Sequence, residues 1–441
     1  PRSLTTTRSA AESEPDLFSL DANTPAGPAD EEGSSPSAAG PGIEDLVVVA
    51  PRGLPRAPVG RIVPVAGPAF TAEFGWDQAW VGYLAAASIV GALFVLTSGI
   101  GLMHRLGGVR ALQLSLLVGA SSLLLYLVPS IGLALIASAC VGLSSGTANP
   151  AGSEVLTRYT PREHRNLVFS IKQAGVPLGG IVGGVAIPPL IDWLGWRFAS
   201  VVIAAACIAT VLATWPFQKG IDPSPEERVQ HRLLSFRLTD ILVPMRSLSR
   251  GERLWRASWV GCLLAIPQAG WITFLVTYLV VALGQSLNTA GFVFAVMQTS
   301  SMFGRVILGW TADRVASGPV TLMLASIGSA VSTILLGLST PAWPLWAFLL
   351  LAAFAGIAVS GWNGVQIAEV ARRSQPELIA ESAAGAVILI FLSNMLTPVA
   401  FAVFIAATGH YDIAFLVSGA FSLICVPLLW GIDRGRPLPD R

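Results

Sequence analysis

The chain has 441 residues, of which 53% are hydrophobic and only 12% are charged, and its mean hydropathy is +0.66. A soluble protein carries about 25% charged residues, so this composition excludes an ordinary soluble protein and indicates many membrane spans. The formal net charge of +1 gives no sign of a nucleic-acid partner.

The start of the chain lacks the pattern of a membrane helix. Residues 1–42 are rich in Pro, Ser, Ala, Gly and acidic residues, which predicts a disordered tail. Residues 51–61 hold three arginines and three prolines, and each arginine near mid-span costs about 3 kcal/mol of insertion free energy. We therefore expect a poorly encoded first helix and no membrane helix over 51–61. A reading-frame slip is the favoured explanation of this stretch. Because the chain opens on Pro1 and its first methionine is Met103, we also expect the N-terminus to be a fragment or an incomplete gene model.

From Trp80 onward, apolar runs long enough to cross a bilayer core of about 30 Å alternate with short polar hinges. A charged linker, residues 217–256, separates two groups of six spans. The sequence therefore predicts an all-α polytopic protein of about twelve helices, with an N-terminal half (43–216), a C-terminal half (257–432) and a cytoplasmic tail (433–441). The predicted spans after the first are 80–102, 111–129, 131–155, 167–191, 197–216, 257–283, 289–312, 319–338, 344–369, 379–407 and 411–431.

Basic residues gather in the loops on one side of the predicted spans. The opposite loops offer only Arg197, beside Asp192, and they also hold acidic residues such as Glu73. Positively charged loops face the cytoplasm, so we expect both termini and the linker 217–256 to be cytoplasmic in a bacterial-type inner membrane. Outside the linker, the arginines of the basic side are Arg105, Arg110, Arg158, Arg162, Arg165, Arg314, Arg372, Arg373, Arg434, Arg436 and Arg441.

Two short patterns recur in the two halves. Arg105 follows span 2, and Arg314 follows span 8 at the matching place. Glu154 lies at the end of span 4 and Glu369 at the end of span 10, and a proline follows each of them seven residues later. Such matching offsets indicate duplicated six-helix halves.

The second copy of the first pattern has a specific form. Gly309-x-x-x-Asp313-Arg314 resembles the loop motif that the major facilitator superfamily carries between helices 2 and 3 and again between helices 8 and 9. The resemblance covers about residues 70–432, and it implies a solute path between the halves and alternating access by rocking. The first copy departs from the motif because His104 stands where the family has an aspartate, which argues against the usual gating latch in that loop.

Span 5 carries a face of glycines. Gly175, Gly179 and Gly183 recur every four residues, so they line one side of the helix and let another backbone approach closely. Pro177 removes an amide donor and is expected to kink the helix. We expect spans 5 and 8 to pack across the interface between the halves. The small residues expected at this contact on span 8 are Ser300 and Gly304.

Two basic residues lie deep in the predicted spans, Lys172 on span 5 and Arg305 on span 8, and no Asp or Glu lies near the middle of a span. A cavity with cations and no carboxylate favours a small organic anion as the solute. Each cation also has another interpretation. The long stem of Lys172 could reach the headgroups about 8 Å away, and a structural role beside Asp313 or Glu381 is the favoured interpretation of Arg305.

The other candidate residues are polar or lie near the cytoplasmic ends. Glu154 with Arg158, and Glu369 with Arg373, are i,i+4 pairs that we expect to cap helices or to join an inner charge network. The uncharged side chains that could line a cavity are Gln173, Gln268, Gln298, Trp362, Asn363 and Asn394. For each of them a helix-to-helix hydrogen bond is the favoured alternative.

The sequence shows no nucleotide-binding glycine loop and no metal-ligand cluster, so we expect neither an enzyme nor an ATP-driven pump, and no cofactor or metal. The leading interpretation is a secondary transporter for a small organic anion, with a proton as the candidate coupling ion. Efflux of a drug-like compound and a non-transporting sensor with a transporter fold are the alternatives. The expected partners are the solute and the lipid bilayer, and the expected state is a monomer.

Overall fold

The computed structural model describes residues 62–98, 105–159, 165–216, 218–222, 238–314 and 317–432. Within these ranges the regular structure is helical, with no strand. The predicted tails 1–42 and 433–441 and the arginine-rich stretch 51–61 lie outside the described residues, so the predictions about them stay predictions.

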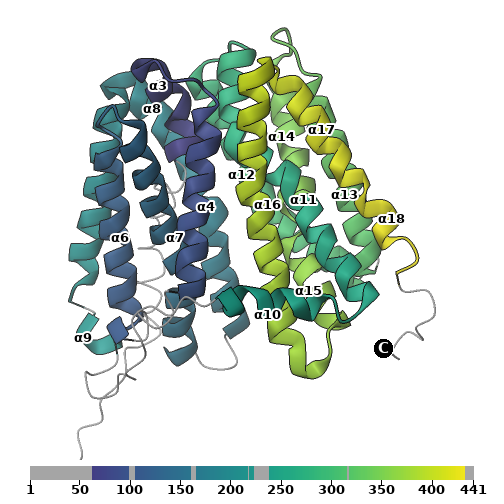
Figure 1. Ribbon diagram of the computed structural model, residues 1–441. Helices are drawn as coiled ribbons and strands as arrows, with labels where there is room; N and C mark the ends of the chain where they lie inside the picture. Colours follow the sequence, from purple (N-terminus) through teal and green to yellow (C-terminus); the bar gives the residue numbers. More distant parts are fainter. Residues whose placement is uncertain are drawn as a thin grey trace, which may run out of the picture. The chain divides into compact units, whose positions relative to one another are not determined.

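The described part of the N-terminal half is a series of mostly long helices (Figure 1). The longest helix of this half, α8, contains a break at Gly195. The φ of Gly195 is 78°, a conformation that residues with a side chain rarely adopt. This break turns one continuous helix into two membrane passes, which correspond to predicted spans 5 and 6. The helices are α3 (Ile62–Phe74), α4 (Trp80–Ser98), α6 (Gly108–Leu125), α7 (Ile131–Tyr159), α8 (Arg165–Thr214) and the short α9 (Gln218–Ile221).

The C-terminal half repeats this arrangement after the linker helix α10 (Leu238–Leu248). Two of its passes are interrupted, one between α14 and α15 and one between α17 and α18. Its elements are α11 (Glu252–Thr277), the π-helical turn η3 (Tyr278–Ala282), α12 (Leu287–Arg314), α13 (Gly318–Gly337), α14 (Leu345–Ser360), α15 (Asn363–Arg373), the short η4 (Pro376–Leu378), α16 (Ile379–Thr408), α17 (Tyr411–Leu423) and α18 (Cys425–Leu429).

The predicted number of spans is confirmed. In the described ranges, 10 helices are long and apolar enough to cross a membrane, and α8 supplies two passes rather than one. Helix α3 supplies the first span, of which 13 residues are described. At about 1.5 Å per residue these cover roughly 20 Å, less than a bilayer core of about 30 Å.

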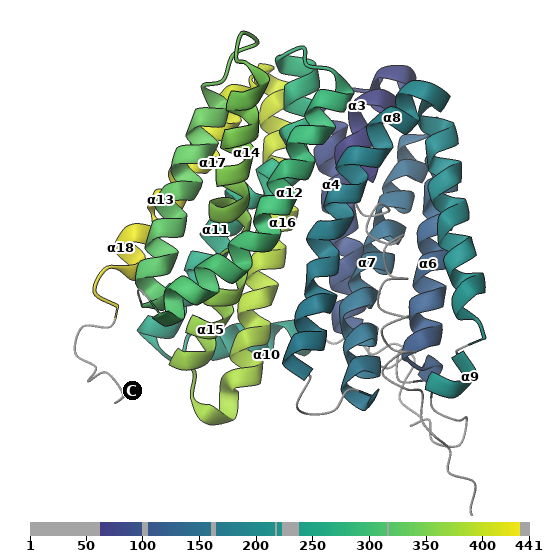
Figure 2. The ribbon, with the colours of Figure 1, turned by 180° about the vertical axis from the view of Figure 1, so that it is seen from behind.

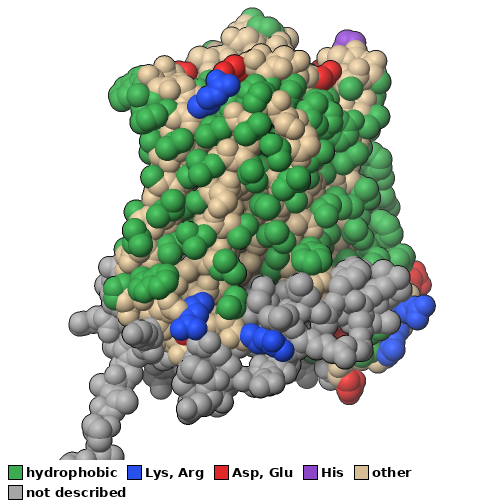
Figure 3. All heavy atoms as spheres, turned by 60° about the vertical axis from the view of Figure 1, so that its left-hand side comes forward, with side chains coloured by type: hydrophobic (Ala, Val, Ile, Leu, Met, Phe, Trp, Pro, Cys, Tyr) green, Lys and Arg blue, Asp and Glu red, His purple; other side chains and the backbone are tan. Residues whose placement is uncertain are grey.

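Charged side chains lie mainly at the two ends of the helices. Figure 3 shows a broad hydrophobic band between these ends on one face of the protein. We call the end that carries α9 and α10 the linker side and the opposite end the Gly195 side. On the Gly195 side, Arg197 forms an ion pair with Glu73, which also accepts a hydrogen bond from the indole of Trp196. The charge of Arg197 is therefore neutralised by Glu73, a neighbouring acidic residue of the same side.

The two halves meet mainly through three pairs of helices, which are α8 with α12, α4 with α16, and α3 with α11, and α4 also touches α11 (Figures 1 and 2). The predicted packing of span 5 against span 8 is thus confirmed. Gly82 of α4 illustrates how close the second contact is, because a Cβ atom there would collide with the carbonyl oxygen of Pro398 and with Ala402 of α16.

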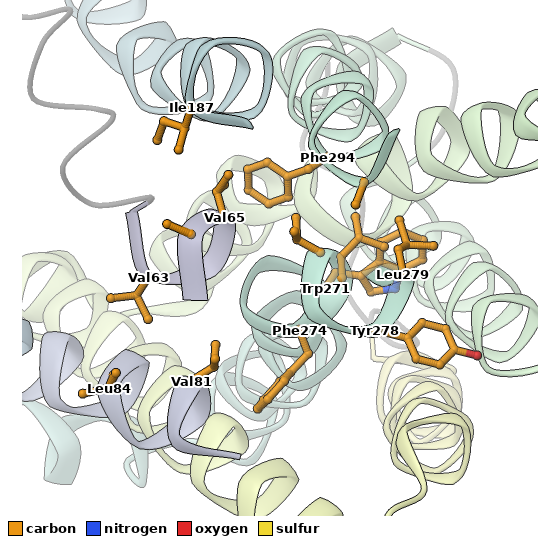
Figure 4. Packing of buried hydrophobic residues seen from close by; sticks show 14 of the residues in the cluster. Val63, Val65, Val81, Leu84, Ile187, Trp271, Phe274, Tyr278, Leu279 and Phe294 are labelled. Carbon is orange, nitrogen blue, oxygen red and sulfur yellow. The ribbon is translucent and has the colours of Figure 1, made fainter. Parts of the chain in front are cut away.

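One large apolar cluster crosses between the halves. Figure 4 shows side chains of α3, α4 and α8 around Trp271, Phe274 and Phe294 from the C-terminal half. Toward the linker side, each buried apolar cluster among the described residues belongs to a single half. Leu254 and Val260 belong to a cluster of the C-terminal half, and Val95 and Ala151 belong to a cluster of the N-terminal half. The apolar contact between the halves is therefore concentrated toward the Gly195 side.

Asp222 ties the beginning of the linker to the N-terminus of α6. Its carboxylate accepts hydrogen bonds from the backbone amides of Val109 at 2.7 Å and Arg110 at 3.0 Å. Gly107, with a φ of 85°, has its Cα directly against this carboxylate, and a Cβ there would overlap with Asp222. The loop before α6, which carries the first copy of the motif, is thus fixed by Asp222, a residue from the linker that caps the N-terminus of α6.

We expect Asp222→Ala to lower the free energy of unfolding by about 1–2 kcal/mol, because two amides at a helix N-terminus lose their acceptor. Asp222→Asn should cost less, since one side-chain oxygen remains. The measurement is the thermal unfolding midpoint of the purified protein, with Asp313→Ala, an exposed aspartate on the same side, as the control. Equal midpoints for Asp222→Ala and the control would contradict this role of the cap.

Candidate functional site

The contact between α8 and α12 brings the backbones of the two halves together. A Cβ atom on Gly184 would collide with the carbonyl oxygen of Gly291, and a Cβ atom on Gly291 would collide with that of Gly184. One turn farther toward the linker side, Gly180 lies against the side-chain amide of Gln298. The contact therefore depends on the absence of side chains at three positions.

The predicted glycine face is correct in part. Gly179 and Gly183 are buried, whereas Gly175 is exposed and a Cβ atom there would meet open space. The expected counterparts on α12 are wrong, because Ser300 lies against Gly356 and Gly304 lies against Ile357, both on α14. These small residues let α14 approach α12 inside the C-terminal half, and the residues of α12 that face α8 include Gly291 and Gln298. Pro177 is buried inside α8.

Gln298 is a polar group at the interface between the halves. Its side chain is 3% exposed, it lies against Gly180 of α8, and it makes no hydrogen bond within the part of the chain that the structure describes. Gln268 on α11 is similarly buried at 6% exposed and has no hydrogen bond among the described residues. Because these amides have no partner among the described residues, they are able to bind a polar ligand or water.

Arg305 lies on the same face of α12 as Gln298, seven residues or about 10 Å nearer the linker side. Its Nε atom is buried and has no hydrogen-bond partner. Among the described residues no ion pair joins Arg305 to Asp313 or Glu381, the partners favoured from the sequence. Asp313 is exposed at the end of α12, and Glu381 lies in the first turn of α16.

Several predicted residues lie where the structure describes the backbone and not the side chain. Lys172 and Gln173 are in α8, and Lys172 precedes Gly180 by eight residues, or about 12 Å along the helix toward the linker side. Glu154 and Arg158 are near the linker-side end of α7. The side-chain roles predicted for these four residues therefore stay predictions.

Three other candidates lie in the C-terminal half. Trp362 is fully buried, and its indole donates to the carbonyl of Val359 at 2.7 Å, where the pass between α14 and α15 is interrupted. It packs in an apolar cluster of this half, and its role in lining a solute path stays a prediction. Asn394 donates to Ile390 of its own helix at 2.9 Å, and Asn363 is partly buried at the start of α15.

The charge network at the linker side is partly as predicted. Glu369 forms ion pairs with Arg373, the expected i,i+4 partner, and also with Arg372. The sequence did not reveal that Glu369 lies against Gly318 in the first turn of α13, where the helix dipole favours a carboxylate. The motif residues Gly309, Asp313 and Arg314 lie at the linker-side end of α12, shortly before α13 in the sequence. Arg105 lies at the corresponding position before α6.

Two polar features were not singled out from the sequence. Asn288 at the start of α12 donates to Asp192 of α8 at 2.5 Å, which links the halves on the Gly195 side. Gln366 is fully buried against Gly261 and donates to the carbonyl of Ala257 at 3.3 Å. Loop composition alone does not indicate the contact between Asn288 and Asp192. The hydrogen bond of Gln366 joins two helices, which is the role that the sequence favoured for the other buried amides.

Comparison with known proteins supports this architecture. The sequence model of the Major Facilitator Superfamily matches residues 59–387. An uncharacterized MFS-type transporter of Mycobacterium tuberculosis is 28% identical over 65% of this chain, which covers 62% of that relative's length. A probable sulfoacetate transporter of Cupriavidus necator is 24% identical to this chain, and the alignment covers 83% of this chain and 90% of that transporter.

A solved structure shows the same fold at lower sequence identity. It is a bacterial homolog of the human lysosomal transporter Spinster, in an inward-facing and unoccupied conformation, with a TM-score of 0.71 and 17% identity. The alignment covers 92% of this chain and 100% of that one. With duplicated halves, twelve passes and a match of the family model across most of its length, the chain belongs to the Major Facilitator Superfamily of membrane transporters.

Proposed function

We propose that the protein moves a small organic anion across the membrane by alternating access. The observation that carries this proposal is Arg305, a membrane-embedded guanidinium without an ion pair among the described residues, on the same face of α12 as the interface residue Gln298. A partly buried guanidinium inside a membrane span favours an anionic partner, and a carboxylate or sulfonate can accept two parallel hydrogen bonds from it. A solute with such a group would supply the missing partner.

The sulfoacetate transporter among the relatives agrees with this class of solute. Sulfoacetate has two acidic groups, and a dianion is best held by two cations. Lys172 on the facing helix α8 is the second cation that we propose, because its backbone lies about 12 Å on the linker side of Gly180, close to the level of Arg305. Gln298 and Gln268 would then donate hydrogen bonds to the remaining oxygens.

The direction in which the site opens follows from the packing between the halves. Apolar contacts and the hydrogen bond from Asn288 to Asp192 join the halves on the Gly195 side. We propose that the linker side is cytoplasmic, since it holds most of the arginines of the described loops, and that this conformation is open toward the cytoplasm. The bacterial inner membrane, proton coupling and a monomeric state remain part of the proposal.

Solute flux in proteoliposomes tests the proposal. The panel should contain sulfoacetate, two acids each paired with its uncharged amide (benzoate with benzamide, lactate with lactamide), and the cation tetraphenylphosphonium. We expect concentrative or exchange uptake of at least one acid and little uptake of its amide. Uptake of the amides or the cation alone would support drug-like efflux, and no flux with any compound would support the sensor.

We expect Lys172→Gln to weaken binding of the transported acid by about tenfold, because a hydrogen bond to a charged group is worth roughly 1.5–3 kcal/mol. Lys172→Arg should retain more of the affinity, although its wider fork fits a different geometry. The measurement is equilibrium binding by the purified variants, with the thermal midpoint recorded beside it. If the lysine only reaches the headgroups, the glutamine variant should bind as tightly as the wild type, and the proposed second cation would be wrong.

A further inference from the structure

A cavity of about 370 Å³ lies on the linker side of the C-terminal half, apart from the interface between the halves. It is formed where the linker helix α10 gives way to α11 and where the chain passes from α15 to α16. Every lining residue belongs to the linker or to this half, so the cavity is separate from the proposed solute path. The lining residues are Ser247, Arg250, Gly251, Glu252, Arg253, Leu254, Arg373, Gln375, Leu378 and Ser382.

More basic than acidic side chains line the cavity. Arg250, Arg253 and Arg373 line it from three different places in the sequence, and Glu252 is the acidic residue among its lining. The side chain of Glu252 is 85% exposed and lies 3.9 Å from Arg256, so it is directed at another cation. Arg373 is only 3% exposed, and its ion pair with Glu369 fixes the guanidinium in the wall of the cavity. Such a concentration of positive charge favours an anionic ligand.

Polar groups complete the lining. The hydroxyl groups of Ser247 and Ser382 are buried and lie 3.4 Å apart, where α10 packs against α16. Helix α11 begins at the cavity with Gly251 as its N-cap, and no side chain caps its first amides. Backbone amides at a helix start donate to oxyanions, and guanidinium groups bind phosphate through paired hydrogen bonds. The hydroxyl of Ser247 donates to the carbonyl of Pro244 at 2.6 Å, so the donors that the cavity offers to a tetrahedral anion are the guanidinium groups, the first amides of α11 and the hydroxyl of Ser382.

We propose that this cavity binds a phosphate-bearing anion, independently of the transported solute. Its volume lies in the range of small-molecule sites and fits a small phosphate ester or the headgroup of an anionic phospholipid. A ligand there would bridge α10, α11, α15 and α16. Since α11 and α16 also contact the N-terminal half, occupancy of the cavity would stabilise elements that move during transport.

Two probes distinguish the sources of the phosphate group. Inorganic pyrophosphate represents a free phosphate compound, and short-chain dihexanoyl-phosphatidylglycerol represents a lipid headgroup. Binding of each should be measured by calorimetry on the purified full-length protein, as wild type and as Arg250→Gln and Arg253→Gln. The matched control is Arg246→Gln, an exposed arginine one turn earlier on α10 that does not line the cavity.

We expect saturable binding of at least one probe and about tenfold weaker binding in both cavity variants, with Arg246→Gln unchanged. Pyrophosphate binding identifies a soluble ligand, whereas binding of the phosphatidylglycerol alone identifies a lipid. Arg305→Gln must leave the binding intact, which separates this site from the proposed solute site. No binding to wild type, an equal loss in Arg246→Gln, or a loss confined to Arg305→Gln would overturn the proposal.

Discussion

An Arg305→Gln transporter should lose uptake of its anion almost completely, with substrate affinity reduced by about ten- to a hundredfold. The guanidinium lies inside the membrane, its Nε is buried without a partner, and the described residues give it no carboxylate. A hydrogen bond between charged groups is worth roughly 1.5–3 kcal/mol, and two parallel bonds would give more. Glutamine keeps a polar side chain and removes the charge, so the loss of substrate affinity would measure the contribution of the guanidinium charge to binding.

Two controls separate a role in binding from a role in stability. Arg305→Lys keeps the charge and should retain part of the affinity, because an ammonium cannot form the paired bonds of a guanidinium. Arg246→Gln removes an exposed arginine and should change neither uptake nor affinity. If Arg305 is structural, Arg305→Gln will lower the thermal midpoint and leave affinity unchanged. That outcome would remove the observation on which the proposed function rests.

A methyl group at Gly291 should have the second large effect. A Cβ atom there would collide with the backbone of Gly184 and with Pro188, and backbone atoms cannot rotate away as a side chain can. Overpacking costs typically about 1–3 kcal/mol, which would shift a two-state equilibrium by about five- to a hundredfold. We therefore expect Gly291→Ala to separate α8 from α12 and to disfavour the conformation closed on the Gly195 side.

The shift can be measured by labelling a cysteine introduced at Ala290, which is fully buried near the Gly195-side start of α12, with a membrane-impermeant maleimide. Gly291→Ala should increase the labelling rate several-fold relative to the same cysteine variant alone. Gly364→Ala, in helix α15, is the matched control, since a Cβ atom at Gly364 meets no neighbour within 4 Å. Unchanged labelling in Gly291→Ala would show that the close backbone contact does not hold this side shut.

The sequence predicted features that depend on local spacing. Apolar run lengths predicted eleven of the passes, and the i,i+4 spacing predicted the ion pair between Glu369 and Arg373. The glycine repeat of span 5 also predicted a close helix contact, although the glycines that meet α12 are Gly180 and Gly184, each one residue beyond the predicted Gly179 and Gly183. In each case a property of one helix was sufficient, because helix geometry fixes which residues share a face.

Features that depend on a neighbouring helix could not be predicted in the same way. Ser300 and Gly304 form a small-residue face as expected, yet that face contacts α14 and not α8. Periodicity places residues on a face and does not say which helix covers it. Likewise, Arg305 is near Asp313 in sequence, but the exposed position of Asp313 at the helix end leaves the two without an ion pair.

Recognition of an anion by this transporter can be measured as equilibrium binding of an acid and its amide to the wild-type protein. The acid to use is the one of the paired acids in the panel that is taken up fastest, because its amide has nearly the same size and shape and lacks the charge. We expect the acid to bind at least about tenfold more tightly than the amide at neutral pH. An amide that binds as tightly as the acid would contradict this expectation.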